Sequence, residues 1–449
     1  MFKKILIANR GEIAVRIIRA CRALGIKTVA VYSTADRNSL HTYLADESVC
    51  IGPAAARDSY LNTTAILQAA KGKGADAIHP GYGFLSENST FAKLCVENGI
   101  TWIGPSPEVI DRMGNKSQAR RTMMDAGVPV VPGSARGVHD AEAALLEARE
   151  IGWPIMIKAS SGGGGKGMRV STCEADFIDQ FNIAQRESQN AFGDNTMYME
   201  RFVQNPRHVE VQIIADEHGN VVALGERDCS VQRNHQKMIE ESPCPVLDEA
   251  VRKQMMDDAV KAARAVGYTS AGTIEFLMDA AQNYYFMEMN TRIQVEHCVT
   301  EMVTHTDLMC EMIRVAAGEP LSFAQDDIVL HGHAIECRVN AEMPEKGFMP
   351  SPGVITQTHF PGGNGVRVDT ATYDGFEITP YYDSMIAKII VHGRDRTEAI
   401  AKMRTALEEM VVVGVSTNLD FQYAIMENET FCKGMADTGF IEKFLRGEV

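Results

Sequence analysis

The chain has 449 residues, of which 45% are hydrophobic and 23% are charged, and 44 basic against 59 acidic side chains give a net charge of −15. This acidity argues against a dedicated nucleic-acid-binding protein, because affinity for a polyanion depends on clustered lysine and arginine. It also argues against a protein held on anionic lipid. Any anionic ligand must therefore be received by cations that are gathered in one place. The length suggests about three domains.

The N-terminus and the cysteines indicate the compartment. The apolar run before Asn9 has only four residues, Ile5–Ala8, whereas a signal peptide needs an apolar stretch of about 7–15 residues. No run approaches the roughly 18 apolar residues of a membrane span. The ten cysteines are scattered without a C-x-x-C pair, which predicts buried thiols rather than a disulfide framework or a zinc site. We therefore expect a soluble cytoplasmic protein without a membrane partner.

Strand and helix patterns alternate over residues 3–110. The predicted elements are buried strands at 5–8, 28–32, 75–78 and 101–103 and an amphipathic helix over 12–24. Such a βαβ rhythm implies a parallel sheet with helices on both faces.

Beyond residue 110 the patterns are mixed. A predicted helix over 116–126 leads into Pro129, Pro132 and Gly133, which favour a domain boundary. The later predicted strands are 155–158, 168–171, 197–201, 208–215, 221–226, 271–278 and 284–290, and the predicted helices are 174–189, 248–266, 307–316 and 397–409. The sequence thus predicts a multidomain protein that combines α/β and α+β parts.

A glycine-rich loop runs from Ser160 to Gly167 and contains Lys166. Glycines let backbone N–H groups crowd around an anion, and a lysine adds a point charge. The loop does not match a phosphate loop, because Gly167 rather than Ser or Thr follows Lys166. Its glycines satisfy the dinucleotide pattern, but residues 168–171 read as extended rather than helical. Protein-kinase partner motifs are missing, so a nucleotide-covering flap and a flexible hairpin tip both remain open.

A second signal is a polar array in which every other residue carries a hydrogen-bonding side chain. The array consists of Glu288, Asn290, Arg292, Gln294 and Glu296. In an extended backbone all five would point to one face. Glu275 lies on a preceding predicted strand, and a hairpin would bring it to Glu288; two close carboxylates favour a cation such as Mg²⁺. The alternative is a polar edge strand.

Four segments together resemble biotin carboxylase of the ATP-grasp superfamily: Ile7–Glu12, His79–Asn88, Gly162–Gly167 and Glu288–Glu296. The resemblance extends over nearly the whole chain. It implies an N-terminal α/β domain at 1–115, a linker helix at 116–133, a mobile glycine-rich lid at 134–204, an ATP-grasp part with the metal and the base at 205–330, and a C-terminal biotin-carboxylase domain at 331–449. The length fits the free-standing subunit of bacterial acetyl-CoA carboxylase.

The resemblance assigns an ATP and metal site. The implied ATP contacts are Lys116, Lys158, Gly162, Gly163, Gly164, Gly165, Lys166, Gly167, Glu200, Val203, His208, Gln232, His235 and Leu277. Mg²⁺ or Mn²⁺, with two ions expected, would be held by Glu275, Glu288 and Asn290 between the phosphates.

The resemblance also assigns the acid–base chemistry. Bicarbonate would lie against Lys237, Arg292, Gln294 and the amide of Val295, and Glu296 would remove its proton so that carboxyphosphate forms. Released phosphate would then deprotonate biotin, while Arg338 stabilises the enolate-like oxygen and Tyr82 lines the biotin side.

Partners and competing functions follow from the same resemblance. No Ala-Met-Lys-Met motif is present, so biotin is expected on a separate biotin carboxyl carrier protein, with carboxyltransferase subunits as further partners and a homodimer as the assembly. The acceptor is acetyl-CoA in fatty-acid synthesis, or alternatively pyruvate or another acyl-CoA. Another ATP-grasp reaction and a non-catalytic nucleotide-binding regulator are the other classes. Two departures from the family pattern are Cys298, where proline is usual, and Arg201, where lysine is common.

Overall fold

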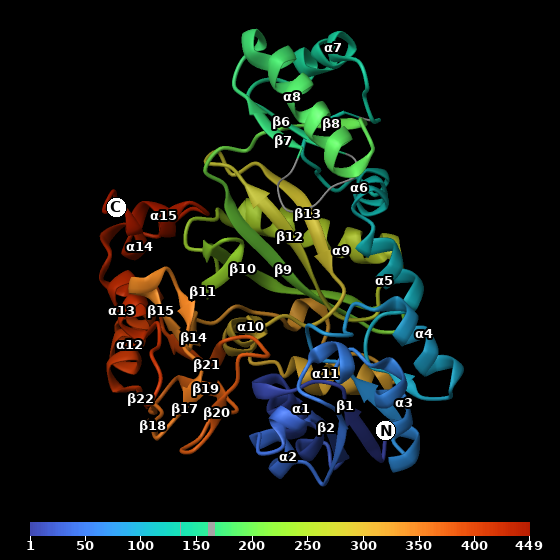
Figure 1. The fold of residues 1–449 in the computed structure, drawn as a ribbon, viewed down its shortest axis with the longest axis vertical. Helices are drawn as coiled ribbons and strands as arrows, with labels where there is room; N and C mark the ends of the chain where they lie inside the picture. Colours follow the sequence, from blue (N-terminus) through green and yellow to red (C-terminus); the bar gives the residue numbers. More distant parts are fainter. Residues whose placement is uncertain (135, 160–166) are drawn as a thin grey trace. The chain divides into compact units, whose positions relative to one another are not determined.

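A computed structural model describes residues 1–134, 136–159 and 167–449 (Figure 1). Gly162, Gly163, Gly164, Gly165 and Lys166 of the predicted flap therefore lie outside the described residues. The chain forms two compact units. The first comprises residues 1–128, 207–276 and 288–449, and the second comprises 129–206 and 277–287. A search of the described residues for a helix long and apolar enough to cross a membrane finds none.

The first unit begins with a parallel sheet of order β3-β2-β1-β4-β5. Its strands are β1 (Lys4–Ile7), β2 (Lys27–Ser33), β3 (Glu47–Gly52), β4 (Ala77–His79) and β5 (Thr101–Trp102). The associated helices are α1 (Gly11–Ala23), α2 (Leu40–Leu44), α3 (Thr63–Lys73), α4 (Ser89–Glu97), α5 (Pro107–Gly114) and α6 (Lys116–Asp125). Apolar side chains of α1 are buried against β1 and β4 in one core cluster, and those of α3 and α4 are buried with β1, β2 and β4 in another. The predicted parallel α/β fold is confirmed.

The helix starts follow from side-chain capping. Asn62, Asn88, Ser106 and Asn115 each accept a hydrogen bond from a backbone N–H of the first turn of α3, α4, α5 and α6. Such caps satisfy donors that otherwise have no partner within the helix. The start of α6 at Lys116 is thus fixed by its neighbour Asn115, as the pattern predicts.

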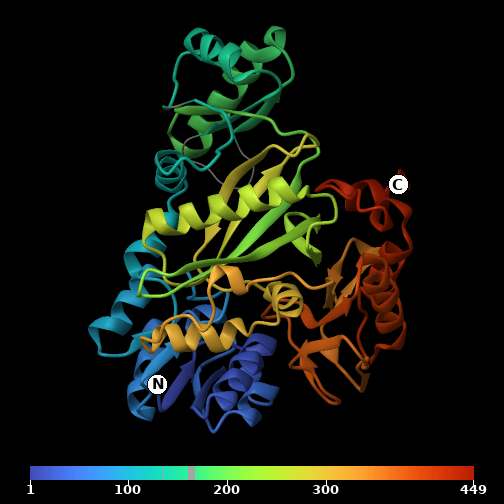
Figure 2. The same ribbon diagram turned by 180° about the vertical axis from the view of Figure 1, so that it is seen from behind.

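A larger sheet carries most of the predicted site, in the order β13-β12-β9-β10-β11-β14-β21-β19. Its strands are β9 (Arg207–Ala215), β10 (Val221–Arg233), β11 (Gln236–Ser242), β12 (Ser270–Met278), β13 (Tyr284–Asn290), β14 (His333–Asn340), β19 (Val366–Thr370) and β21 (Met385–Gly393). The pairs from β9 to β19 are antiparallel. Helix α9 (Glu249–Val266) packs along β9 and β10, as Figure 2 shows from behind. Strand β10 is longer than predicted because Arg227 and Asp228 continue it rather than forming a turn.

The remaining elements surround this sheet. The helices are α10 (His297–Thr304), α11 (Leu308–Ala316), α12 (Arg396–Glu409), α13 (Leu419–Glu427), α14 (Glu429–Cys432) and α15 (Phe440–Leu445). Short strands pair as β15 (Glu342–Met343) with β16 (Met349–Pro350), β17 (Gly353–Val354) with β20 (Glu377–Ile378), and β18 (Gln357–His359) with β22 (Val411–Val413). Single 3₁₀ turns lie at Thr34–Asp36, Ala56–Asp58, Gln325–Asp327 and Pro344–Lys346. Helix α12 packs on β21 and β14, and α11 packs on α1.

The second unit contains a sheet of order β7-β6-β8, with strands β6 (Ile155–Ala159), β7 (Met168–Ser171) and β8 (Met197–Arg201) and helices α7 (Ala141–Ile151) and α8 (Glu174–Phe192). Strands β6 and β7 are antiparallel, which confirms that strands flank the glycine segment. Gly167 has a φ of +71°, and a Cβ there would lie 2.9 Å from the Cβ of Ala159. This end of the segment therefore requires glycine.

Two predictions are wrong in the described residues. Strand β13 ends at Asn290, so residues 288–296 are not one extended strand; the backbone turns because the polar side chains after Asn290 bind partners in different directions. Cys50 and Cys173 are exposed, which contradicts the prediction of buried thiols. Cys50 lies on the edge strand β3 and Cys173 precedes α8, where no element covers them. All ten cysteines are free thiols.

Candidate active site

A buried lysine in the large sheet of the first unit contacts three carboxylates. Lys237 Nζ, on β11, lies 2.5 Å from Glu210 Oε2 on β9, 3.0 Å from Glu275 Oε1 on β12 and 2.6 Å from Glu296 Oε1. The lysine side chain is only 12% exposed. Burial opposes its charged form, but the three carboxylates raise the pKa of Lys237 well above its usual value. Lys237 is therefore a fixed positive charge in the site.

A fully buried arginine, Arg227 on β10, supports this lysine from the same sheet. Its Nε donates to Glu210 Oε1 at 2.6 Å, and its terminal nitrogens donate to Gln212 at 2.6 Å and to Gln294 at 2.8 Å. Arg227 and Glu210 were not identified from the sequence. The signal there is weak, because Glu226-Arg227-Asp228 reads as a charged turn; only the apolar residues on both sides indicate a continuous strand.

Glu275 is surrounded by donors. Its Oε1 accepts hydrogen bonds from Asn290 Nδ2 and from Gln294 Nε2, both at 2.8 Å, and its Oε2 lies 3.2 Å from His208 Nε2. Burial acts against ionisation, but the charges of Lys237 and His208 lower the pKa of Glu275. Burial lowers the pKa of His208, but the carboxylates of Glu275 and Glu210 raise it to about 9. Glu275 is thus held in its ionised form.

Glu288 and Asn290 complete a set of oxygen donors near Glu275. Burial, followed by the negative charge of Glu275, raises the pKa of Glu288, and the Lys116 ammonium lies 3.8 Å from its Oε2. Two carboxylates and an amide oxygen are ligands that Mg²⁺ prefers. A divalent cation would relieve the repulsion that raises the pKa of Glu288, so these residues fit the implied metal. Glu275 and Glu288 lie on the neighbouring strands β12 and β13.

Glu296 lies directly before α10 and has both carboxylate oxygens engaged. Oε1 binds Lys237, and Oε2 accepts from Arg338 Nη2 on β14 at 3.0 Å. Arg338 Nε in turn donates to Glu240 Oε1 at 2.6 Å. Burial acts to raise the pKa of Glu296, but the charges of Lys237 and Arg338 lower this pKa to about 2. Glu296 is therefore an ionised carboxylate held between two cations.

The turn between β13 and α10 is held from several sides. Arg292 Nε donates to Glu87 Oε2 at 2.9 Å, and Arg292 Nη2 donates to Asn290 Oδ1 at 3.0 Å. The carbonyl oxygen of Val295 accepts from the buried Lys388 at 2.5 Å. Glu87 and Lys388 were not identified from the sequence, and these contacts explain why the backbone leaves the strand after Asn290.

Three predicted contacts lie outside this hydrogen-bonded cluster. Tyr82 donates from its hydroxyl to Glu12. Gln232 pairs with Lys237 in the β10–β11 ladder, and His235 occupies the hairpin turn with a φ of +62°. The structure thus brings Gln232 beside the cluster through the backbone, and it leaves His235 exposed.

The second unit carries the other described ATP candidates. Lys158 on β6 forms an ion pair with Glu200 on β8, and their side chains are 39% and 23% exposed. Val203 follows β8, and Leu277 lies in the part of β12 that belongs to this unit. The structure therefore joins Lys158 to Glu200 through neighbouring strands, because Met156 pairs with Glu200 in the ladder.

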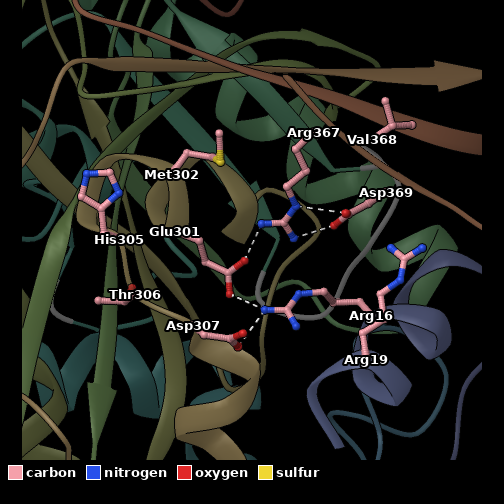
Figure 3. A pocket seen from close by; sticks show the side chains of 10 residues that line it. All are labelled: Arg16, Arg19, Glu301, Met302, His305, Thr306, Asp307, Arg367, Val368 and Asp369. Atoms are coloured by element: carbon pink, nitrogen blue, oxygen red, sulfur yellow. Dashed lines mark hydrogen bonds and ion pairs between the residues drawn. The ribbon is translucent and has the colours of Figure 1, made fainter. Parts of the chain in front are cut away.

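A separate cavity of about 540 Å³ lies in the first unit, and Figure 3 shows its lining. Arg16 contacts Glu301 at 2.9 Å and Asp307 at 2.7 Å, and Arg367 contacts Glu301 at 2.7 Å and Asp369 at 2.6 Å. None of the predicted site residues is among the lining residues in the described part of the chain. Since Arg16 and Arg367 are paired with the carboxylates that line it, we assign this cavity no ligand.

Comparisons with known proteins assign the chain to a family. The family model described as biotin carboxylase, N-terminal domain, matches residues 1–110, and the biotin carboxylase C-terminal domain model matches residues 336–443. The carbamoyl-phosphate synthase L chain, ATP binding domain, matches residues 115–324. Biotin carboxylase 1 of Bacillus subtilis is 58% identical over 445 residues, which cover 99% of each chain. This chain belongs to the biotin carboxylase family.

Two further relatives extend the comparison of biotin carboxylases. A pyruvate carboxylase subunit of Methanothermobacter thermautotrophicus is 53% identical, with 100% of this chain and 91% of that protein covered. The biotin carboxylase domain dimer of the Hydrogenobacter thermophilus 2-oxoglutarate carboxylase, in complex with MgADP, ADP and bicarbonate, is 48% identical with a TM-score of 0.90. That match covers 100% of this chain and 99% of the other. These two relatives are thus named as parts of two different carboxylases.

Proposed function

We propose that this chain carboxylates biotin borne on a separate biotin carboxyl carrier protein, with ATP and bicarbonate as co-substrates and carboxyphosphate as the intermediate. The observation that carries the proposal is the buried contact of Glu296 with both Lys237 and Arg338. A carboxylate held between two cations supports the assignment of Glu296 as the base, and Lys237 also contacts Glu275. Family membership supports the same chemistry.

The ATP contacts form the second part of the proposal. We propose that Lys116 and Lys158 contact the phosphates, that the 162–167 segment covers them, and that the remaining contacts are Glu200, Val203, His208, Gln232, His235 and Leu277. Glu275, Glu288 and Asn290 would hold Mg²⁺, or Mn²⁺. When bound, the metal ions neutralise charge that develops on the transferring phosphoryl group. The matched relative with MgADP supports this assignment.

Binding of bicarbonate gives a role to the cations beside the proposed base. Bicarbonate would bind Lys237, Arg292 and Gln294 together with the Val295 amide, so that it displaces Glu296 from at least one of its ion pairs. The O–H bond of bicarbonate then breaks, its proton passes to Glu296, and the freed oxygen attacks the γ-phosphorus of ATP while ADP leaves. Carboxyphosphate is the product of this step.

The biotin end uses Arg338. Carboxyphosphate divides into CO₂ and phosphate, and phosphate removes the N1′ proton of biotin. The guanidinium of Arg338 stabilises the negative charge that develops on the ureido oxygen, and Tyr82 lines the biotin. The N1′ nitrogen then forms a bond to CO₂.

The carboxyl acceptor and the assembly are also proposals. We propose the acetyl-CoA carboxylase role in fatty-acid synthesis, with carboxyltransferase subunits as partners and a homodimer in solution. The second candidate is a two-subunit pyruvate carboxylase or another acyl-CoA carboxylase, because the Methanothermobacter pyruvate carboxylase subunit matches over the whole chain. The domains at 1–115, 116–133, 134–204, 205–330 and 331–449 are proposed as the functional divisions.

The experiment is transfer of isotopically labelled bicarbonate to free biotin or to a biotinylated carrier domain. We expect label in biotin only when ATP and Mg²⁺ are both present. Label that enters an amino acid or carbamoyl phosphate, with none in biotin, would contradict the proposal and favour another ATP-grasp reaction.

A further inference from the structure

One face of the C-terminal part of the large sheet carries a row of buried charged side chains beside the proposed base. Glu240 on β11 pairs with Glu336 on β14 in the ladder, and Arg338 on β14 pairs with Lys388 on β21. Side chains two residues apart on a strand share a face, so all four lie on the same face. The neighbouring β14 residues Ile335 and Cys337 point into the apolar core on the other face.

Glu240 contacts the guanidinium of Arg338 at two nitrogens, one of which also contacts Glu296. Its Oε1 accepts from Arg338 Nε at 2.6 Å and lies 2.5 Å from Arg338 Nη2, whereas Glu296 Oε2 accepts from Nη2 at 3.0 Å. Glu240 is fully buried. The guanidinium of Arg338 is therefore clamped between two carboxylates, and a double contact to one of them sets the orientation of its plane.

The backbone of Arg338 is fixed as well. Its carbonyl oxygen accepts from Asn418 Nδ2 and from Gln422 Nε2, each at 3.0 Å, at the start of α13. With the backbone and Nε both held, the remaining freedom lies at the end of the side chain, which faces Glu296. Glu240 thus determines where that end points.

The two carboxylates have different fates in the proposed reaction. Once Glu296 takes the proton of bicarbonate, it loses its negative charge and with it the charge-assisted bond to Arg338. Arg338 is needed after that moment, for the biotin oxygen. Glu240 takes no part in the proton transfer and keeps its contacts with Nε and Nη2.

We propose that Glu240 is a positioning residue that holds Arg338 in its biotin-activating orientation after Glu296 has been protonated. The inference rests on the proposed function and deepens it. Glu336, the ladder partner of Glu240, makes no hydrogen bond through either carboxylate oxygen in the described residues, and therefore it supplies no second grip on Arg338.

The charges around Glu240 give the inference a pH dependence. The charged groups that act on it are Arg338 and Glu336 from β14, Lys237 from its own strand and Glu296 from the turn before α10. The buried thiols of Cys229 and Cys337 are also near enough to interact with its charge, Cys337 from the other face of the sheet. Burial raises the pKa of Glu240 to about 7, and the charge of Glu296 adds to this while Arg338 opposes it. Protonation of Glu240 as the pH falls would remove its negative charge and weaken its hold on Arg338.

The test compares Glu240→Gln with Glu336→Gln as a matched control, measuring labelled biotin carboxylation and bicarbonate-dependent ATP hydrolysis without biotin. We expect Glu240→Gln to lower carboxylation by about 10- to 100-fold, as misplacement of a catalytic group does. Its ATP hydrolysis should change by less than about threefold, since loss confined to one step leaves the other intact. Glu336→Gln should change both rates by less than about threefold.

Two further readouts separate positioning from a structural role. In the wild type the ratio of carboxylation to biotin-independent hydrolysis should fall as pH drops through about 7, and Glu240→Gln should remove that fall. Glu240→Asp keeps the negative charge and should carboxylate biotin faster than Glu240→Gln. If Glu240→Gln does not fold, Glu240→Asp is tested alone, and its ratio of carboxylation to hydrolysis should still fall as the pH drops.

Three results would overturn the inference: equal losses of both activities in Glu240→Gln with a normal melting temperature, no loss in either, or a ratio independent of pH in the wild type. A wild-type chain without any bicarbonate-dependent hydrolysis would instead overturn the proposed function, and this inference with it.

Discussion

Two lysine–glutamate sites in this chain, one in each compact unit, differ in how far they are built before any ligand arrives. Lys237 in the first unit is buried among Glu210, Glu275 and Glu296, whereas Lys158 in the second unit shares a half-exposed pair with Glu200. An exposed pair contributes about 0–1 kcal/mol, but breaking a buried one costs about 3–5 kcal/mol. The proposed proton chemistry is thus preorganised, and the proposed nucleotide contacts are adjustable.

The largest effect is expected when the proposed catalytic base of the buried site, Glu296, is removed. Glu296→Ala should lower bicarbonate-dependent ATP hydrolysis by about 100- to 10,000-fold, the usual worth of a general base. ATP binding, measured by calorimetry, should remain, because the proposed phosphate contacts are elsewhere. Near-normal turnover in this variant would refute the assignment of the base.

The next effect separates the two halves of the reaction. Arg338→Ala should lower biotin carboxylation by about 100- to 1,000-fold, as loss of an oxyanion donor does, while ATP cleavage falls much less. Parallel assays of ATP cleavage and labelled biotin measure the split. If both rates fall equally, Arg338 has no special role toward biotin.

The buried ion pairs of Glu301 lie outside the proposed active site. They test whether burial alone makes an ion pair stabilise the fold. Glu301 contacts Arg16 and Arg367. Burial acts to raise the pKa of Glu301, but the two arginines and His297 lower this pKa to about 2. The pairing therefore stabilises the fold above about pH 4.5 and is lost as pH falls toward 2.

Glu301→Gln should accordingly cost about 3 kcal/mol of unfolding free energy at neutral pH, and less at about pH 3. Urea unfolding at the two pH values provides the measurement. A cost that is unchanged, or larger, at the lower pH would show that the carboxylate charge is not the source of the stabilisation.

The smallest effect is expected at the exposed pair. Lys158→Ala should change the unfolding free energy by less than about 0.5 kcal/mol, as exposed pairs do. It should still raise the KM for ATP about tenfold, by loss of one charged phosphate contact. The matched variant Arg149→Ala removes another exposed ion pair of this unit, with Glu174, and should leave that KM unchanged.

Much of the fold could be predicted because its signals are local. Apolar runs define β1 and β2, α6 begins at Lys116 as predicted, and strands β7 and β8 begin and end where the pattern predicts. The turn after Asn290 could not be predicted. It depends on Lys388 and Arg227, which are distant in sequence and hold Val295 and Gln294.

The candidate site was predicted as far as its residue types are distinctive. The approach of Glu275 and Glu288 follows from a hairpin and from carboxylate chemistry. Glu210, Arg227 and Glu240 were missed because a charged residue within a strand has no local mark of burial. Only their partners across the sheet show that Glu210 and Glu240 face Lys237 and Arg338.

The dependence of ATP turnover on bicarbonate and biotin tests the central claim most directly. Steady-state ADP release would be measured with Mg²⁺ and ATP while bicarbonate and free biotin are varied independently. We predict little turnover without bicarbonate and a further rise with biotin. Turnover that is insensitive to both, or that requires ammonia and ignores biotin, would contradict the account.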